Sequence, residues 1–225
     1  MSTKGVYTAL SGAMAQSSRL DTIANNIANV NTPGFKKDDQ TFQEYVTANE
    51  KPPGVIQVPR ITASVESFYD MQGGDKAFVD SAGTHTSFQQ GSLKATNNKL
   101  DAAIDGNGFF EVYTPQGVRL TRVGAFKLDG NGQLVTKDGH PVLKSAGEGQ
   151  DPASRTFRVT GEQQIAIAEN GDIYEGDEII GRLSVVDVAN KSSLHKIGNS
   201  LFDFKPNIQP EITNVQNPSV KQGFL

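Results

Sequence analysis

The chain contains 225 residues, enough for one domain of ordinary size or for one domain with an appendage. Hydrophobic residues make up 36% of it, and 21 Lys and Arg nearly balance 25 Asp and Glu, which excludes a fully disordered chain and argues against a nucleic-acid-binding protein. Because cysteine is absent, disulfides, thiolate zinc sites and cysteine nucleophiles are excluded. No apolar run approaches the roughly 18 residues of a membrane span, and we expect neither a membrane span nor a cleaved secretion signal.

Residues 3–30 have the pattern of a helix. Apolar or small residues recur there at alternating spacings of four and three, broken only by Ser17: Val6, Leu10, Ala13, Leu20, Ala24 and Ile27. We call these six residues the seam, because the spacing is that of a coiled-coil contact and is narrower than the stripe of a core helix. The helix should end before Pro33, which disfavours the α region for Thr32. The spacing alone leaves open whether the seam packs on its own domain or on another subunit, and the abrupt end favours an assembly element.

The rest of the chain has the pattern of a β protein. We expect residues 36–79 to be a connecting region with some β structure, including possible strands at 55–58 and 61–65. From residue 80 to 215 short alternating runs are separated by turn sequences such as Asp129–Gly132, in which Asp-Gly and Asn-Gly supply the positive φ of hairpin turns. The predicted fold is therefore mainly β: an antiparallel β domain with an N-terminal coiled-coil-type helix, α+β overall.

No pattern of catalytic or ligating residues is convincing. The three histidines, His85, His140 and His195, are far apart and not at metal-ligand spacing. A calcium loop starting at Asp129 fails because no closing Glu follows, so turn formation is the better interpretation. Ser193 and Lys196 have the Ser-x-x-Lys spacing of penicillin-recognising enzymes, but the accompanying motifs are missing. We predict no catalytic, cofactor-binding or metal-binding residues.

Several long motifs are, however, specific. Ser11–Met14 and Ile23–Lys36 strongly resemble the N-terminal signature of the bacterial flagellar rod and hook proteins. The stretches Gln90–Leu93, Asn98–Phe110 and Leu120–Leu143 resemble central motifs of the same family. The chain is accordingly identified as similar to the flagellar basal-body rod proteins. Its length and lack of large insertions favour the proximal (FlgF-like) branch, with the distal (FlgG-like) branch as the alternative.

This resemblance implies a structural protein that is not an enzyme. Members are exported unfolded by the flagellar type III apparatus and stack with copies of themselves and with other rod and hook-basal-body proteins into a helical tube. The tube crosses the periplasm in the basal body and transmits torque from motor to hook. The terminal helices would form its inner layer, and the β domain would lie outside.

The same resemblance assigns an assembly interface. It comprises the seam together with residues near the end of the helix: Asn25, Asn26, Asn29, Asn31 and Phe35. The asparagines would supply lateral hydrogen bonds, and the alternative is that they form only the helix end and its turn. We expect residues 1–35 to form the assembly helix and turn, 80–215 the β domain, and 216–225 a return segment.

The family pattern continues from that return segment into a C-terminal helix, which is missing after Leu225. Two functions from other classes remain as alternatives. A β-sandwich ligand-binding module is weakened by the absence of Trp, and a hydrolase would need a convergent acid–base site.

Overall fold

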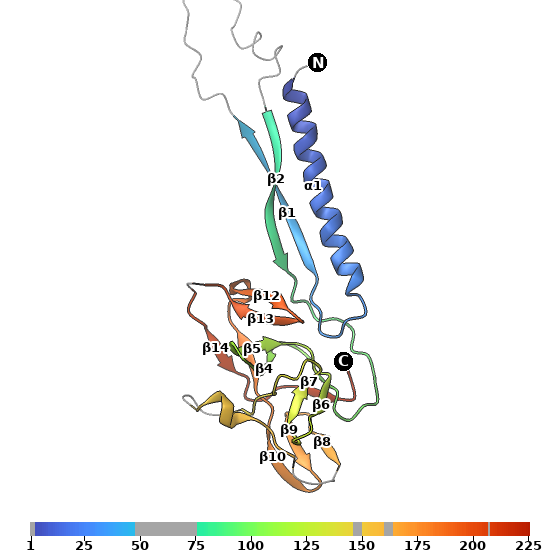
Figure 1. Cartoon of the computed structure of the whole chain (residues 1–225), viewed down its shortest axis with the longest axis vertical. Coiled ribbons are helices and arrows are strands. Elements are labelled where there is room, and N and C mark those ends of the chain that lie inside the picture. The colour runs from blue at the N-terminus through green and yellow to red at the C-terminus, as the bar shows by residue number, and fades with distance from the viewer. Residues whose placement is uncertain (1–2, 48–75, 146–149, 160–163, 207) are drawn as a thin grey trace, which may run out of the picture. The chain divides into compact units, whose positions relative to one another are not determined.

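In a computed structural model, residues 3–47, 76–145, 150–159, 164–206 and 208–225 are described (Figure 1). The chain divides into two compact units. In chain order the elements are α1 (Thr3–Ala28), β1 (Asp38–Thr47), β2 (Lys76–Thr86), β3 (Ala102–Ile104), β4 (Phe109–Thr114), β5 (Gly117–Thr121), β6 (Phe126–Leu128), β7 (Leu134–Thr136), η1 (Pro152–Arg155), β8 (Ile165–Ile167), β9 (Asp172–Glu175), β10 (Glu178–Arg182), β11 (Val185–Val188), η2 (Lys191–Ser193), β12 (Leu194–Gly198), β13 (Leu201–Phe204), β14 (Ile212–Asn214) and β15 (Val220–Gln222).

The first unit contains α1 and a two-stranded sheet of β1 and β2. The helix packs on β1 through small and polar side chains rather than through its seam. Ala15 is buried, and the half-buried residues Ser11, Gly12, Ser18, Thr22 and Asn26 lie on the same face. Polar bonds fix this contact: the Asn26 side chain exchanges two hydrogen bonds with the Asp38 backbone at 2.9 and 3.0 Å, and Gln40 donates to the Ser18 hydroxyl at 2.8 Å.

The second unit contains residues 29–37 and everything from Thr86 onward. Its largest sheet has six strands in the order β12-β13-β5-β4-β11-β14, and β10-β9-β8, β6-β7 and β15-β3 form smaller antiparallel sheets. The last strand, β15, lies beside β3 and pairs Val220 with Ile104. Beyond it, Leu225 and Lys94 exchange two backbone hydrogen bonds, so the end of the described chain belongs to this unit.

Two apolar clusters form the core of the second unit. The larger is built around Phe110, Val112, Leu134, Phe157 and Leu183, and the smaller around Phe109, Leu120, Val186, Leu194 and Phe202. One buried carboxylate between the strands is well satisfied. The Glu111 carboxylate accepts hydrogen bonds from Arg155 and from the Ser184 hydroxyl, both at 2.6 Å. A buried pair with this many partners avoids the desolvation cost of an isolated charge.

Tight turns connect the strands as the sequence predicts. The Asp129 carboxylate accepts from the backbone N–H groups of Asn131 and Gln133 at 2.8 and 2.7 Å, so this side chain caps its own turn. Gly124 is required for another reason, because a Cβ there would lie 1.6 Å from the Ala102 carbonyl oxygen.

The prediction of a mainly antiparallel β protein with one N-terminal helix is confirmed. The helix ends at Ala28, just before the turn sequence that predicted its end. The strands expected at 55–58 and 61–65 lie outside the described residues. No helix in the described ranges is long and apolar enough to cross a membrane.

Candidate functional site

The seam of α1 is exposed along its whole length. Val6, Leu10, Leu20 and Ile27 are 59%, 52%, 65% and 66% exposed, and both alanines of the seam are exposed as well. An amphipathic helix normally turns its apolar stripe toward the core of its own domain. Here the small polar face contacts β1 instead, so the apolar face of α1 has no cover from the described part of this chain.

Sequence reasoning missed part of this face. Tyr7, Met14 and Ile23 are 63%, 65% and 41% exposed, and Tyr7 and Met14 directly follow seam positions seven residues apart. The seven-residue spacing of Tyr7 and Met14 is the feature of the sequence that could have identified them as part of this face. Together with the seam these side chains make a stripe wider than an a/d contact, enough for more than one neighbouring helix.

The polar residues assigned to the interface are distributed over two places. Asn25 is an exposed helix residue, whereas Asn26 is bonded to Asp38 as described above. Asn29 shapes the turn after the helix, because its carbonyl oxygen accepts from the Thr32 N–H at 3.0 Å and its side chain from the Thr32 hydroxyl at 3.2 Å. Asn31 is exposed in the same turn.

The segment 29–37 is anchored in the second unit by Gly34, Phe35 and Lys36. Gly34 has φ +68°, and a Cβ on it would lie 2.7 Å from the backbone of Arg122 and Val123, so only glycine fits. The Phe35 ring lies 4.3 Å from the Lys196 ammonium, which also donates to the Lys36 carbonyl. The Lys37 carbonyl accepts from the Ser87 N–H at 2.9 Å.

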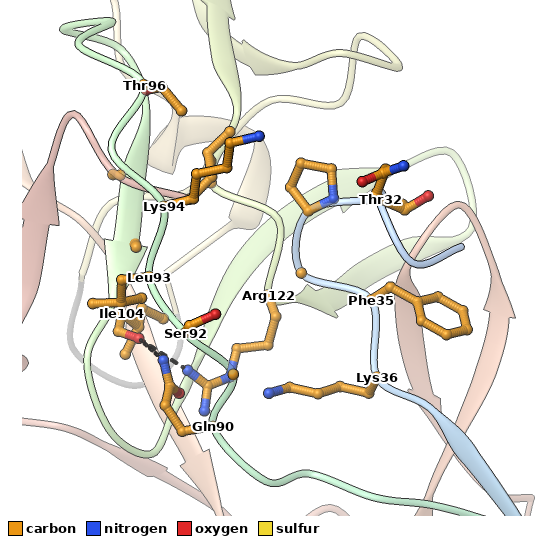
Figure 2. Close-up of a pocket in the computed structure, with 18 of the residues that line it drawn as sticks. Thr32, Phe35, Lys36, Gln90, Ser92, Leu93, Lys94, Thr96, Ile104 and Arg122 are labelled. Atoms are coloured by element: carbon orange, nitrogen blue, oxygen red, sulfur yellow. Dashed lines mark hydrogen bonds between the residues drawn. The ribbon is translucent and has the colours of Figure 1, made fainter. Parts of the chain in front are cut away.

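A pocket of about 460 Å³ lies beside this anchored segment (Figure 2). Its walls come from residues 30–36, from the stretch 90–96, from β3 and from the Arg122–Gly124 connection. The described lining includes the cations Lys36, Lys94 and Arg122 but no Asp, Glu or His. Such a lining suits the binding of an anion. Within the described residues no group of three or more His, Asp or Glu could hold a metal ion.

Lys36 and Arg122 are the charged groups that the fold itself places in the pocket. Lys36 is only 8% exposed, and its ammonium donates to the Gln89 carbonyl at 2.7 Å. Burial, together with the positive charges of Arg122 and Lys191, lowers the pKa of Lys36 from its ordinary 10.5 to about 8. Burial also lowers the pKa of Arg122, while the charge of Asp187 raises it. Sequence reasoning missed both residues as site residues, because the sequence carries no sign that this lysine is buried.

The lowered pKa of Lys36 predicts a specific dependence of stability on pH. Between about pH 8 and pH 10.5 the unfolded chain holds a proton at Lys36 that the folded chain has lost, so the free energy of unfolding rises with pH in this window. Denaturant titrations at pH 7.5, 9 and 10 should show this rise in the unchanged protein and a smaller one in Lys36→Met. Lys94→Met, at an exposed lysine of the same pocket, should keep the original profile. If the free energy of unfolding rose equally with pH in all three proteins, the lowered pKa of a buried Lys36 would be contradicted.

Comparison with known proteins identifies the family. Residues 6–36 match the family described as "Flagella basal body rod protein", and residues 103–175 match the "Flagellar hook protein FlgE/F/G D1 domain". The first match contains the seam, the turn and Lys36, and the second contains Arg122 and most of the β core.

Curated relatives are similar over most of the chain. The flagellar basal-body rod protein FlgG of Agrobacterium fabrum is 32% identical over 96% of this chain and 81% of its own length. FlgF of Mesorhizobium japonicum is 30% identical over 98% of this chain and 79% of its own length. FlgG of Bacillus subtilis is 34% identical over 88% of this chain and 72% of its own length. Similarity of this extent to proteins of one kind shows that the chain belongs to the flagellar basal-body rod protein family.

Proposed function

We propose that this member of the family is an axial subunit of the proximal (FlgF-like) section of the flagellar rod. In this role it leaves the cell through the flagellar type III export apparatus and assembles with copies of itself and with other rod proteins into a helical tube. The tube transmits torque from the motor to the hook. The function is structural rather than catalytic, and its place is the basal body.

The observation that carries the self-assembly proposal is the exposed apolar stripe on α1. Seven large side chains, Val6, Tyr7, Leu10, Met14, Leu20, Ile23 and Ile27, are between 41% and 66% exposed. Covering the exposed part of each contributes on the order of 1 kcal/mol. A stripe of this size on one helix is characteristic of an interaction surface rather than of scattered exposed residues. Repetition of the same contact from copy to copy gives an open helical assembly when the interface does not close into a ring.

The distal section of the rod is the second candidate location. The relatives named FlgG match this chain about as well as those named FlgF, with 32% and 34% identity against 30%. The proximal assignment is supported by the absence of large insertions within the given sequence.

A charge placed on the seam should prevent assembly without unfolding the isolated protein. Ile27 is 66% exposed, so Ile27→Asp should change the melting temperature of the purified chain little. In the rod the same carboxylate would be buried without a partner, at a cost of several kcal/mol in every copy. A strain that encodes only this variant should lose motility. Ile27→Leu, an apolar change at the same position, is the matched control and should remain motile. A motile Ile27→Asp strain would contradict the role of the seam.

Locating the protein in purified hook-basal bodies distinguishes the two sections of the rod. A small tag inserted at the exposed Asp138–Gly139 turn keeps the termini and the seam free. Electron cryo-microscopy of the tagged particles should then show the extra density on the part of the rod nearest the motor. Extra density next to the hook would contradict the proximal proposal and favour the distal one. A particle without the extra density would contradict both.

A further inference from the structure

We propose that the pocket beside residues 30–36 binds a carboxylate group between Lys36 and Arg122, and that the acidic tip of the β9–β10 hairpin of a second copy supplies it. The inference rests on the proposed function in one respect, since it takes another copy of this chain as the neighbour. It adds a second contact to the α1 stripe, one made by charge rather than by apolar surface.

The first support is the position of the two cations. Figure 2 shows the Lys36 side chain extending toward the Arg122 guanidinium, which is bonded to the Ile104 carbonyl. Like charges that face each other in a largely buried place repel, and each costs desolvation energy as well. A fold keeps such an arrangement at lower cost when an anion lies between the two groups, because the anion reverses the sign of the interaction with both.

The second support is unused hydrogen-bonding capacity at the same point. The Lys36 ammonium has three donors, and one donates to the Gln89 carbonyl. The Arg122 guanidinium donates to the carbonyl oxygens of Ile104 at 3.4 Å and Gly106 at 2.6 Å, whereas its buried Nε–H has no partner among the described residues. A carboxylate accepts from both kinds of donor, with stronger bonds than a neutral acceptor makes.

The described lining of the pocket carries three cations, Lys36, Lys94 and Arg122, and no Asp or Glu. The positive charge of Lys191 also acts on Lys36 and lowers its pKa. Asp187 is the carboxylate that acts on Arg122, and it also lies 3.9 Å from the Lys191 ammonium. Asp187 is thus shared between Arg122 and Lys191.

The β9–β10 hairpin carries the complementary group. Asp177 and Glu178 are adjacent and exposed at its tip, where Gly176 has φ +63°, and no described residue forms an ion pair with either. Ile179, the next residue, is 56% exposed, and Val30 on the rim of the pocket is 76% exposed, so an apolar contact can accompany the charged one. Figure 1 places this hairpin and the anchored segment at opposite ends of the second unit. A tip at one end and a pocket at the other suit a head-to-tail contact between copies rather than a contact within one copy.

Zero-length cross-linking of the full chain tests the contact directly. Equal amounts of ¹⁵N-labelled and unlabelled protein are mixed at high concentration and treated with a carbodiimide, which activates a carboxylate so that a lysine amine in contact with it can form an amide. Mass spectrometry should find Lys36 joined to Asp177 or Glu178, with mixed-isotope pairs that show two different copies. Asp177→Asn together with Glu178→Gln should reduce this cross-link at least tenfold. Asp138→Asn, at an exposed turn elsewhere, should leave it unchanged. A Lys36 joined only to acids of its own copy, or to none, would overturn the inference.

A binding measurement keeps the test independent of self-association. A blocked peptide with the sequence of residues 175–179 should shift the NMR signals of Gly34 and Lys36, and its affinity should fall with added salt. The matched peptide with Gln and Asn in place of the acids should bind at least tenfold more weakly. Equal binding of the two peptides would show that the pocket does not select a carboxylate.

The outcomes also separate this inference from the proposed function. A strain whose subunits carry the Asp177→Asn and Glu178→Gln changes, and in which rods form and stay as stable as before, would overturn the contact and leave the rod function standing. If the protein were absent from the basal body while its pocket still bound the acidic peptide, the rod function would be overturned and the carboxylate site would stand.

Discussion

The arrangement of the whole protein depends on one constraint: α1 is a 26-residue helix that buries a single alanine among its described side chains. Most of the stability of a protein helix comes from covering an apolar face, and the two glycines and several Ser, Thr and Asn residues of α1 lower its own propensity. The contact with β1 uses small side chains and a few hydrogen bonds, and it leaves the large apolar residues in solvent. The exposed stripe is therefore the surface on which we propose that α1 contacts other subunits.

The β unit has the opposite character. Its two clusters bury phenylalanine, leucine, isoleucine and valine side chains almost completely, and the buried Glu111 carboxylate is paired with Arg155. The buried apolar core of the described residues is thus concentrated in this unit. The segment 29–37 connects the two parts of the chain. Because Gly34 and Lys36 fix this segment in the β unit, the pocket has a wall of defined shape.

The sequence predicted the features that depend on local patterns. Periodicity and Pro33 predicted the extent of α1, and Asp-Gly turns such as the one at Asp129 predicted the hairpins. Features that depend on tertiary contacts were not predictable. The face of α1 that contacts β1 consists of Ser, Gly, Ala and Thr, which have no apolar period, and a lysine such as Lys36 normally indicates a solvent-exposed position. The contribution of Val220 to the core was likewise missed, because a three-residue strand has too little alternation to recognise.

Hydrogen exchange of the isolated, verified monomer tests the central claim most directly. If α1 needs other subunits to be stable, its backbone amides should exchange within the range of local opening, while those of β3, β4 and β15 should exchange only through global unfolding. The protection factors of the helix amides should be at least a hundredfold lower than those of these strands. Protection of residues 6–27 equal to that of β4 would show that the helix is held by its own chain, and the assembly role of its apolar stripe would then have to be withdrawn.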